Sequence, residues 1–377
     1  MHWLPALSIG SALLLAACRD GTERDPHRNG QQALESAPAL QLTRLAASPE
    51  NLDLTTVTGL EVDSRRQIYV ADFPSLRIIV LSESGDPVRT LGRRGSGPGE
   101  FQFIRSLQLL AADSLLVFDE GQNRVSIFPP GSDSAAYGLN LAATTGRGPP
   151  YQLHRLPGDG GFIAAYTRPF RPSDDPRDDE GRDEILRLLH PDGRIRRDSV
   201  LRFPAENYLV AREAGQVAVT LSPFGRRSVF DVGRDGKVYH GSGDSSMVSV
   251  FSPEGSRLAG FRVPELPDPV TRKQVEALAA ALGQPFDRVV RANVPQRWGS
   301  FQRLMVDDRT VWVEQGGPQR RLVAFDNGGR VTGVAALPRG FEPRLVRYGR
   351  LYGVQKDADG VPRVVVYGFQ APSTTSS

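Results

Sequence analysis

Residues 92–128 of the 377-residue chain read GRRGSGPGEFQFIRSLQLLAADSLLVFDEGQNRVSIF. A turn rich in Gly and Pro comes first, and three short apolar segments follow it, separated by further turns. The second segment ends at Asp119, and the third opens with Asn123-Arg124. Apolar residues at every second position, with turn residues every eight to twelve, are typical of antiparallel strands. The stretch therefore predicts most of one small antiparallel sheet.

The same pattern recurs along the rest of the chain. A large apolar residue shortly after a turn marks the middle of each of six units: Tyr69, Leu116, Phe162, Tyr239, Trp312 and Tyr352. A twisted sheet that is apolar on both faces has to pack against a neighbour on each side, and six copies achieve this by closing a ring. The sequence predicts an all-β fold, a six-bladed β-propeller with four-stranded antiparallel blades, over residues 39–370. The alternative is a β-sandwich with similar strands by chance, and six units in phase disfavour it.

The last unit supplies only three strands before the chain ends. Residues 40–45, LQLTRL, read as a strand without a partner upstream of the first unit. We expect this strand to pair outside the sixth blade, so that hydrogen bonds between the two ends of the chain close the ring.

The stretch 92–101 also carries a family resemblance. Together with Tyr-Val-Ala-Asp at 69–72 and Asn-Arg-Val at 123–125, it resembles the NHL-type repeats of six-bladed propellers. In particular it resembles those of lipid-anchored bacterial propeller proteins. The resemblance implies a structural role for Asp72 and Asp119, whose carboxylates would accept backbone N–H groups. It implies little about activity, because propellers serve as binding modules and as enzymes.

The N-terminus reads as a targeting segment. An apolar run over residues 4–17 is too short to span a bilayer and ends in Leu15-Ala16-Ala17-Cys18, which resembles a bacterial lipobox. That resemblance implies cleavage before Cys18, the only cysteine, and lipid attachment to it. We expect a signal peptide over 1–17, a flexible tether over 18–38 and a disordered tail over 371–377. Arg19 favours the outer membrane if the source has two membranes. The alternative is an unprocessed N-terminus with an incidental cysteine.

Two units contain insertions. A charged, Pro-rich loop over 168–183 reads as a solvated extension of a hairpin. Residues 268–293, ahead of the fifth blade, read as a helical insertion in which Asp268-Pro269 starts a helix and Gly283 stops it. Its apolar stripe has to dock either over the central channel or on the rim, and the sequence leaves both open.

The segments before the innermost strands indicate a ligand site at the mouth of the channel. Most of them contain Arg, often with an aromatic residue, and these groups suit a ligand that bears a carboxylate, a sulfate or a sugar. The alternative is compositional, since Arg is abundant throughout. The candidate ligand-binding residues are Arg93, Arg94, Arg147, Arg226, Arg227, Arg297, Trp298, Phe301 and Arg339.

The sequence carries no recognisable catalytic motif, and we expect no cofactor and no metal ligands; His154 and His240 lie in strands of different blades. The net charge of +3 is modest and no block of like charge exists, which argues against a nucleic-acid partner. We expect a non-catalytic binding or scaffold module at the cell envelope, with a protein, glycan or small anion as partner and membrane contact through the lipid alone. The alternative is a metal-dependent propeller hydrolase or lyase (a lactonase, an esterase or an NHL-type lyase) acting on an extracellular substrate.

Overall fold

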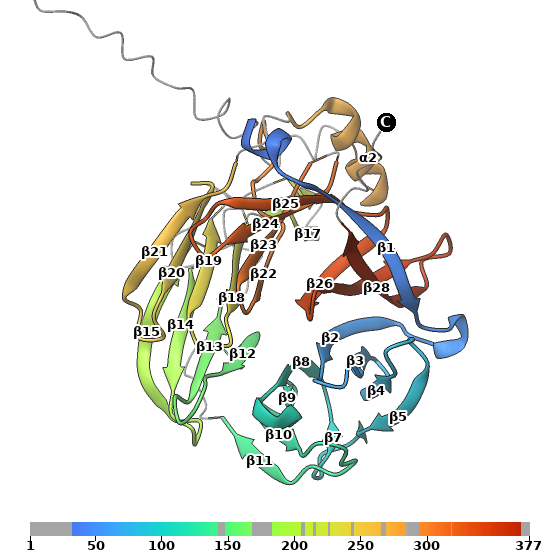
Figure 1. Cartoon of the computed structure of the whole chain (residues 1–377), viewed down its shortest axis with the longest axis vertical. Helices are drawn as coiled ribbons and strands as arrows, with labels where there is room; N and C mark the ends of the chain where they lie inside the picture. Colours follow the sequence, from blue (N-terminus) through green and yellow to red (C-terminus); the bar gives the residue numbers. More distant parts are fainter. Residues whose placement is uncertain are drawn as a thin grey trace, which may run out of the picture.

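The computed structural model describes residues 32–141, 148–167, 183–204, 208–213, 216–224, 227–242, 245–264, 269–283, 285, 294–317 and 319–370. Most of these residues form β-strands, and the sheets are arranged around a common centre (Figure 1). Four of the sheets are four-stranded and antiparallel. They comprise β2 (Thr56–Val62), β3 (Ile68–Phe73), β4 (Arg77–Leu81) and β5 (Pro87–Leu91); β8 (Ile104–Leu109), β9 (Leu115–Asp119), β10 (Arg124–Phe128) and β11 (Tyr137–Asn140); β12 (Gln152–Arg155), β13 (Phe162–Tyr166), β14 (Glu184–Leu189) and β15 (Ile195–Phe203); and β18 (Ser228–Val232), β19 (Val238–Ser242), β20 (Met247–Phe251) and β21 (Arg257–Arg262).

Eight further strands form a single sheet, so the prediction of six separate sheets is wrong. In order along the sheet they are β22 (Arg303–Asp307), β23 (Thr310–Gln315), β24 (Arg321–Asp326), β25 (Val331–Ala336), β1 (Ala39–Ala47), β28 (Pro362–Gln370), β27 (Arg350–Lys356) and β26 (Phe341–Arg347). The eight strands form one sheet because β1 pairs with β25 on one side and with β28 on the other. Its first residues, Ala39 and Leu40, pair in parallel with β25 before the strand continues along β28.

The N-terminal strand pairs as the sequence predicts. β1 runs antiparallel to β28, from Gln41 opposite Gln370 to Ala47 opposite Val365. The guanidinium of Arg363 donates to the carbonyl of Ser48 at 2.6 and 2.9 Å. Upstream, residues 32–36, which the sequence places in the tether, are helical, and Leu34 is buried in the core. The two ends of the described chain are therefore held together by hydrogen bonds.

The core lies between neighbouring sheets, as expected for sheets that are apolar on both faces. One cluster joins Tyr69 and Val80 of the first sheet to Leu107 of the second, and equivalent clusters fill the other spaces around the ring. All six marker residues of the repeat are buried. The innermost strands β2, β8, β12, β18, β22 and β26 follow one another around the centre, since β2 contacts β8 and β26, β8 contacts β12, and β22 contacts β18 and β26. His154 of β12 meets Phe230 of β18 edge to face.

The predicted structural role of the two aspartates is confirmed. Asp119 accepts hydrogen bonds from the backbone N–H groups of Gln102 and Phe103 and from that of Gln122 in the following turn. Asp72 accepts from the backbone of Thr55 and Thr56. Each carboxylate thus fastens the end of a middle strand to the segment that leads into the innermost strand.

Two insertions occupy connections between an outermost strand and the next innermost strand. The first is a hairpin of β16 (Tyr208–Glu213) and β17 (Gln216–Leu221). The second holds α2 (Arg272–Ala281), which lies ahead of the fifth unit as predicted. Its start differs from the prediction: Thr271 is the N-cap, in a capping box with Gln274, and Pro269 pairs with Arg297 instead. Gly283 follows the helix end in the left-handed conformation, as expected of a stop signal.

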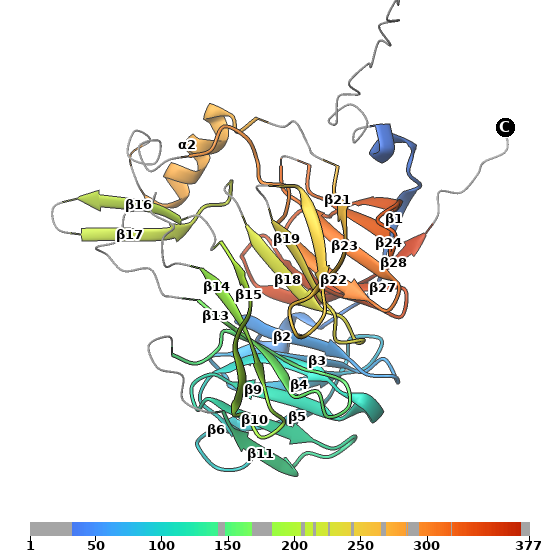
Figure 2. The same cartoon turned by 90° about the vertical axis from the view of Figure 1, so that its left-hand side faces the viewer.

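The apolar stripe of α2 packs on the connections that lead into β18 and β22. Val275 and Ala279 are buried against Phe224 and Trp298. The helix and the β16–β17 hairpin project from the same side of the molecule (Figure 2). This side is the one where β18 and β22 begin, because both insertions are joined directly to those strands. Residues 286–293 of the predicted helical insertion and most of the charged loop 168–183 lie outside the described residues.

Candidate functional site: the arginine pocket

The centre of the ring holds a polar cavity of about 470 Å³. A smaller cavity of about 180 Å³ shares three of its lining residues, Gln152, Arg303 and Arg344, and extends toward β2. Four arginines from four different blades line the larger cavity, and we refer to them as the arginine pocket: Arg105, Arg227, Arg303 and Arg344.

Backbone irregularities place two of these arginines. In β8, Ile104 pairs with Asp119 and Ser106 with Phe118, so Arg105 between them has no partner across the strand. In β26 the same shift leaves Arg344 unpaired in the ladder. A β-bulge of this kind re-aims the side chain of the extra residue. Both bulges lie near the start of an innermost strand, and both arginines line the cavity.

Arg303 is the most weakly satisfied of the four. Its buried Nε has no hydrogen-bond partner among the described residues. The nearest carboxylate oxygen is Oε2 of Glu314, 3.6 Å from that nitrogen. The other oxygen of Glu314 already accepts two hydrogen bonds from Arg320, at 2.5 and 3.0 Å. Among the described residues Arg303 therefore has one long ion pair, to Glu314, and no hydrogen bond.

Electrostatics at Arg303 favour an added negative charge. Burial lowers the pKa of the Arg303 guanidinium, and the positive charge of Arg344 lowers it further. Arg227 acts in the same direction, whereas Glu314 and Glu342 oppose it. Because a guanidinium stays protonated in proteins, the residue remains a cation with like charges beside it. An anion in the cavity would relieve this repulsion.

A polar network that includes the carboxylate of Glu184 forms another part of the wall. The hydroxyl of Ser228 donates to Oε2 of Glu184 at 3.0 Å and lies 2.9 Å from Nε2 of His240. His240 stacks on Phe203 with ring centroids 3.5 Å apart, and burial lowers its pKa to about 3, so the imidazole is uncharged near neutral pH. The network joins the third and fourth sheets and holds the Glu184 carboxylate at the cavity.

Carboxylates gather where the innermost strands end. Oε2 of Glu61 lies 3.7 Å from Nη2 of Arg347. Oε2 of Glu61 is buried without a hydrogen-bond partner among the described residues, and so are Nε and Nη1 of Arg347. Burial raises the pKa of Glu61 to about 7 and that of Asp231 to about 6. Arg347 ends β26, and the two acids lie near the ends of β2 and β18, so this cluster connects three blades; Asp231 also lines the larger cavity.

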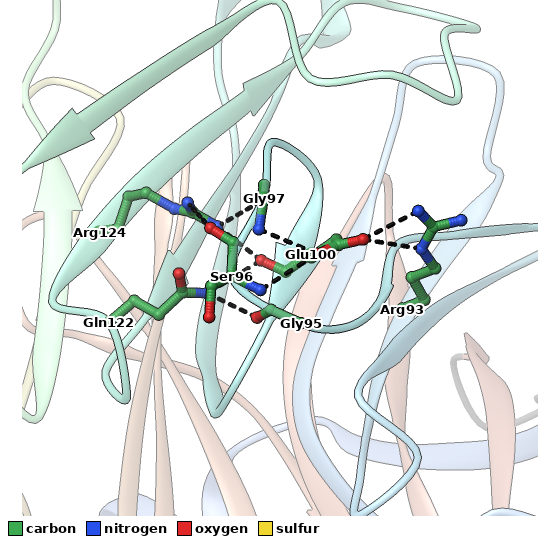
Figure 3. A network of polar contacts seen from close by, with 7 residues as sticks. All are labelled: Arg93, Gly95, Ser96, Gly97, Glu100, Gln122 and Arg124. Atoms are coloured by element: carbon green, nitrogen blue, oxygen red, sulfur yellow. Dashed lines mark hydrogen bonds and ion pairs between the residues drawn. The ribbon is translucent and has the colours of Figure 1, made fainter.

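The two sequence-predicted arginines of the loop over residues 92–101 are bonded within this loop and its surroundings. Figure 3 shows Arg93 in the loop, together with Gln122 and Arg124, which donate to its carbonyls. Arg93, in the short strand β6 (Arg93–Arg94), pairs with the carboxylate of Glu100 at 2.8 Å, and Arg94 donates to the carbonyl of Pro74. The other carboxylate oxygen of Glu100, in β7 (Glu100–Phe101), accepts from the backbone of Ser96 and Gly97. Neither arginine lines the cavity.

Other predicted residues are also placed away from the channel. Phe301 is fully buried in the core, and Trp298 packs edge to face on Phe224 beneath α2. Arg297 and Arg339 are exposed and line none of the described cavities. Arg227 does line the main cavity. Cys18, Arg147 and Arg226 lie outside the described residues and stay predictions.

The sequence carried a signal for the arginines that were missed. Arg303 and Arg344 open the alternating segments RLMVD and RLVRY, and Arg105 directly precedes SLQLL. These three arginines lie within the innermost strands and line the cavity, whereas the predicted residues came from the segments ahead of those strands.

Comparisons with known proteins are consistent with the fold. No protein family matches the sequence, and no curated protein does. A solved structure of a DUF4221 family member from Bacteroides vulgatus is 10% identical, with a TM-score of 0.52 over 88% of this chain and 98% of that one. A Bacteroides fragilis protein described as exported is 11% identical, with a TM-score of 0.52 over 89% and 97%. An inactive virginiamycin B lyase variant from Staphylococcus aureus, solved with quinupristin, is 12% identical, with a TM-score of 0.45 over 87% and 98%. The first two likenesses support the β-propeller fold.

Two further observations concern only the described part of the chain. No group of three or more His, Cys, Asp or Glu residues there is arranged to hold a metal ion. Within the same residues, no helix is long and apolar enough to cross a membrane.

Proposed function

We propose that this protein is a binding module that takes a small anionic ligand into the arginine pocket. The observation that carries the proposal is the state of Arg303. Its guanidinium is partly buried, lies among like charges and has no hydrogen bond from the described residues. A buried charge is normally paired, so a site of this kind is completed by a ligand of opposite charge.

The cavity has the dimensions and lining of a ligand site. Its volume of about 470 Å³ lies within the range of small-molecule pockets. Gln152 and Glu184 offer acceptors beside the arginines, which suits a ligand with hydroxyl or amino groups as well as an anionic group.

The test is a binding measurement with simple anions. We would titrate acetate, sulfate, phosphate and glucuronate by calorimetry at constant ionic strength, against the wild type, Arg303→Gln and Arg309→Gln. Arg309 is an exposed residue of the turn between β22 and β23, so its variant is a control for lost charge in the same blade. We expect Arg303→Gln to weaken binding of the best anion about tenfold or more, as for a lost charge-assisted hydrogen bond. Unchanged affinity in Arg303→Gln would overturn the proposal.

We also propose that the chain acts at the cell envelope, held there by lipid on Cys18. The lipobox-like sequence supports this, and two or more acyl chains are enough to anchor a protein without a spanning helix. Metabolic labelling with a palmitate analogue tests it: the label should be incorporated by the wild type and lost in Cys18→Ser. Equal labelling of both would contradict it.

We count the propeller as six-bladed. The eight-stranded sheet consists of two four-strand units, β22–β25 and β26–β28 with β1, whose strands are joined by the short parallel pairing of Ala39 and Leu40 with β25. Each unit places its own innermost strand, β22 or β26, beside the channel. The pairing at β25 therefore joins two blades at their outer edges without changing the number of repeats.

A further inference from the structure

We infer that the ligand carries two separated anionic groups, one at each side of the channel. This inference rests on the proposed function and adds the shape of the ligand to it. Within the ring, β8 has β2 and β12 as neighbours, whereas β22 has β18 and β26. The strands β8 and β22 therefore face each other across the centre. Arg105 and Arg303 line the same cavity from these two opposite strands.

The first cationic pole lies on the side of β18, β22 and β26. Arg303 has no hydrogen bond from the described residues, and Arg344 has one, from Nη2 to Glu342 at 3.2 Å. The buried Nε of Arg344 has no partner. Arg303, Arg344 and Arg227 line the same cavity, and β22 contacts both β18 and β26. The positive charges of Arg344 and Arg227 also lower the pKa of Arg303. This pole can hold one carboxylate between two guanidinium groups.

The second pole is Arg105. Its Nε donates to the carbonyl of Tyr151 at 2.8 Å and lies 3.4 Å from Glu120. These contacts fix the guanidinium by one nitrogen only, and the structure records no hydrogen bond from the described residues to its two terminal nitrogens. The side chain is 39% exposed although it lines the cavity. Its free edge is thus available to a second anionic group.

The wall between the poles is polar and offers acceptors. Gln152 contributes an amide on β12, and Ser228 and Glu184 contribute the network that joins the third and fourth sheets. Carboxylate or amide oxygens along this wall disfavour further negative charge in the middle of the ligand. The arrangement fits a short dicarboxylate, with its two charges at the ends and a neutral chain between them.

The experiment compares glutarate with its monomethyl ester, which has the same chain and one charge fewer. Calorimetric titrations at constant ionic strength use the wild type, Arg105→Gln, Arg303→Gln and the control Arg309→Gln. We expect the wild type and the control to bind glutarate about tenfold more tightly than the ester. Arg105→Gln should bind glutarate only as tightly as the ester, with its affinity for the ester unchanged. Arg303→Gln should weaken the binding of both compounds.

Different results separate the two proposals. If the wild type binds glutarate and the ester equally, or if Arg105→Gln weakens both to the same degree, the two-pole ligand is wrong and a single anion site remains. The proposed function itself is wrong if Arg303→Gln binds both compounds as tightly as the wild type does, or if none of the four proteins, the wild type included, binds either compound. Succinate and adipate, titrated in parallel, give the spacing between the poles. Melting curves of the four proteins establish that each variant is folded.

Discussion

The loop over residues 92–101 and the arginine pocket use the same residue types in opposite ways. In the loop, Arg93 is 2.8 Å from Glu100, and Arg124 donates to three backbone carbonyls at 2.6 to 2.9 Å. In the pocket, Arg303 is 3.6 Å from a carboxylate that is already shared with Arg320. The turn supplies acceptors because it directs the carbonyls of Ser96, Gly97 and Glu100 toward Arg124, whereas the described residues give Arg303 no hydrogen bond. The difference teaches that an arginine indicates a ligand site only where the backbone leaves it without acceptors.

The largest effect is expected at Gly92, the first residue of the loop over residues 92–101. Gly92 has φ +72°, and a Cβ there would lie 2.3 Å from Cε2 of the fully buried Phe101. Gly131 has the same φ with nothing within 4 Å, so it is a matched control. We expect Gly92→Ala to reduce the free energy of unfolding by about 3–4 kcal/mol and Gly131→Ala by only about 1 kcal/mol, the cost of the left-handed backbone alone. Urea denaturation measures the free energy of unfolding of both variants. Equal losses would show that the close packing of residue 92 on Phe101 does not contribute to stability.

The next effect contrasts two arginines directly. Arg124→Met removes a donor from the carbonyls of Ser96, Gly97 and Glu100, although Gly97 keeps the N–H of Glu100 and Glu100 keeps Nε2 of Gln122, so we expect a loss of about 1–3 kcal/mol in unfolding free energy. Arg303→Met removes a cation that is repelled by its neighbours, so its stability should equal or exceed that of the wild type. Urea denaturation of both variants measures these two changes in unfolding free energy. A larger loss in Arg303→Met than in Arg124→Met would reverse the roles assigned to the two regions.

The smallest effect concerns Glu61, in the cluster with Asp231 and Arg347, and it depends on pH. The pKa of Glu61 is about 7, above its ordinary value of 4.5, because of burial; Arg347 and Arg234 oppose the shift and Asp231 adds to it. The folded state therefore binds more protons than the unfolded state between about pH 4.5 and 7, and its stability falls as pH rises through this window.

Glu61→Gln removes this dependence. We expect the variant to be more stable than the wild type by about 1–2 kcal/mol at pH 8 and similar to it at pH 4, because Arg347 loses a weak partner at the same time. Glu276→Gln, on the exposed face of α2, is the control and should leave the pH profile unchanged. Parallel profiles for wild type and Glu61→Gln would show that this carboxyl does not titrate near neutrality.

Much of the architecture follows from the sequence, because the signal is repeated. Trp312 and the other marker residues identify the buried middle strands, and the orphan segment that begins near Leu40 predicts the closure of the ring. The parallel pairing of Leu40 with β25 was not predictable from the sequence, because it depends on where β1 passes the edge of β25 in the folded protein. Arg105, Arg303 and Arg344 lie at or beside the start of alternating segments in the sequence, but the sequence does not show which of these side chains a bulge turns into the channel, because a bulge such as the one at Arg344 is set by strand pairing.

The most direct test of the central claim is a crystal structure with the tightest-binding anion of the calorimetric series. Its oxygens should lie within hydrogen-bond distance of the Arg303 guanidinium, inside the ring of innermost strands. An anion seated instead against Arg93 or Arg94 on the loop, with only solvent beside Arg303, would contradict the account and return the site to the loops that the sequence first suggested.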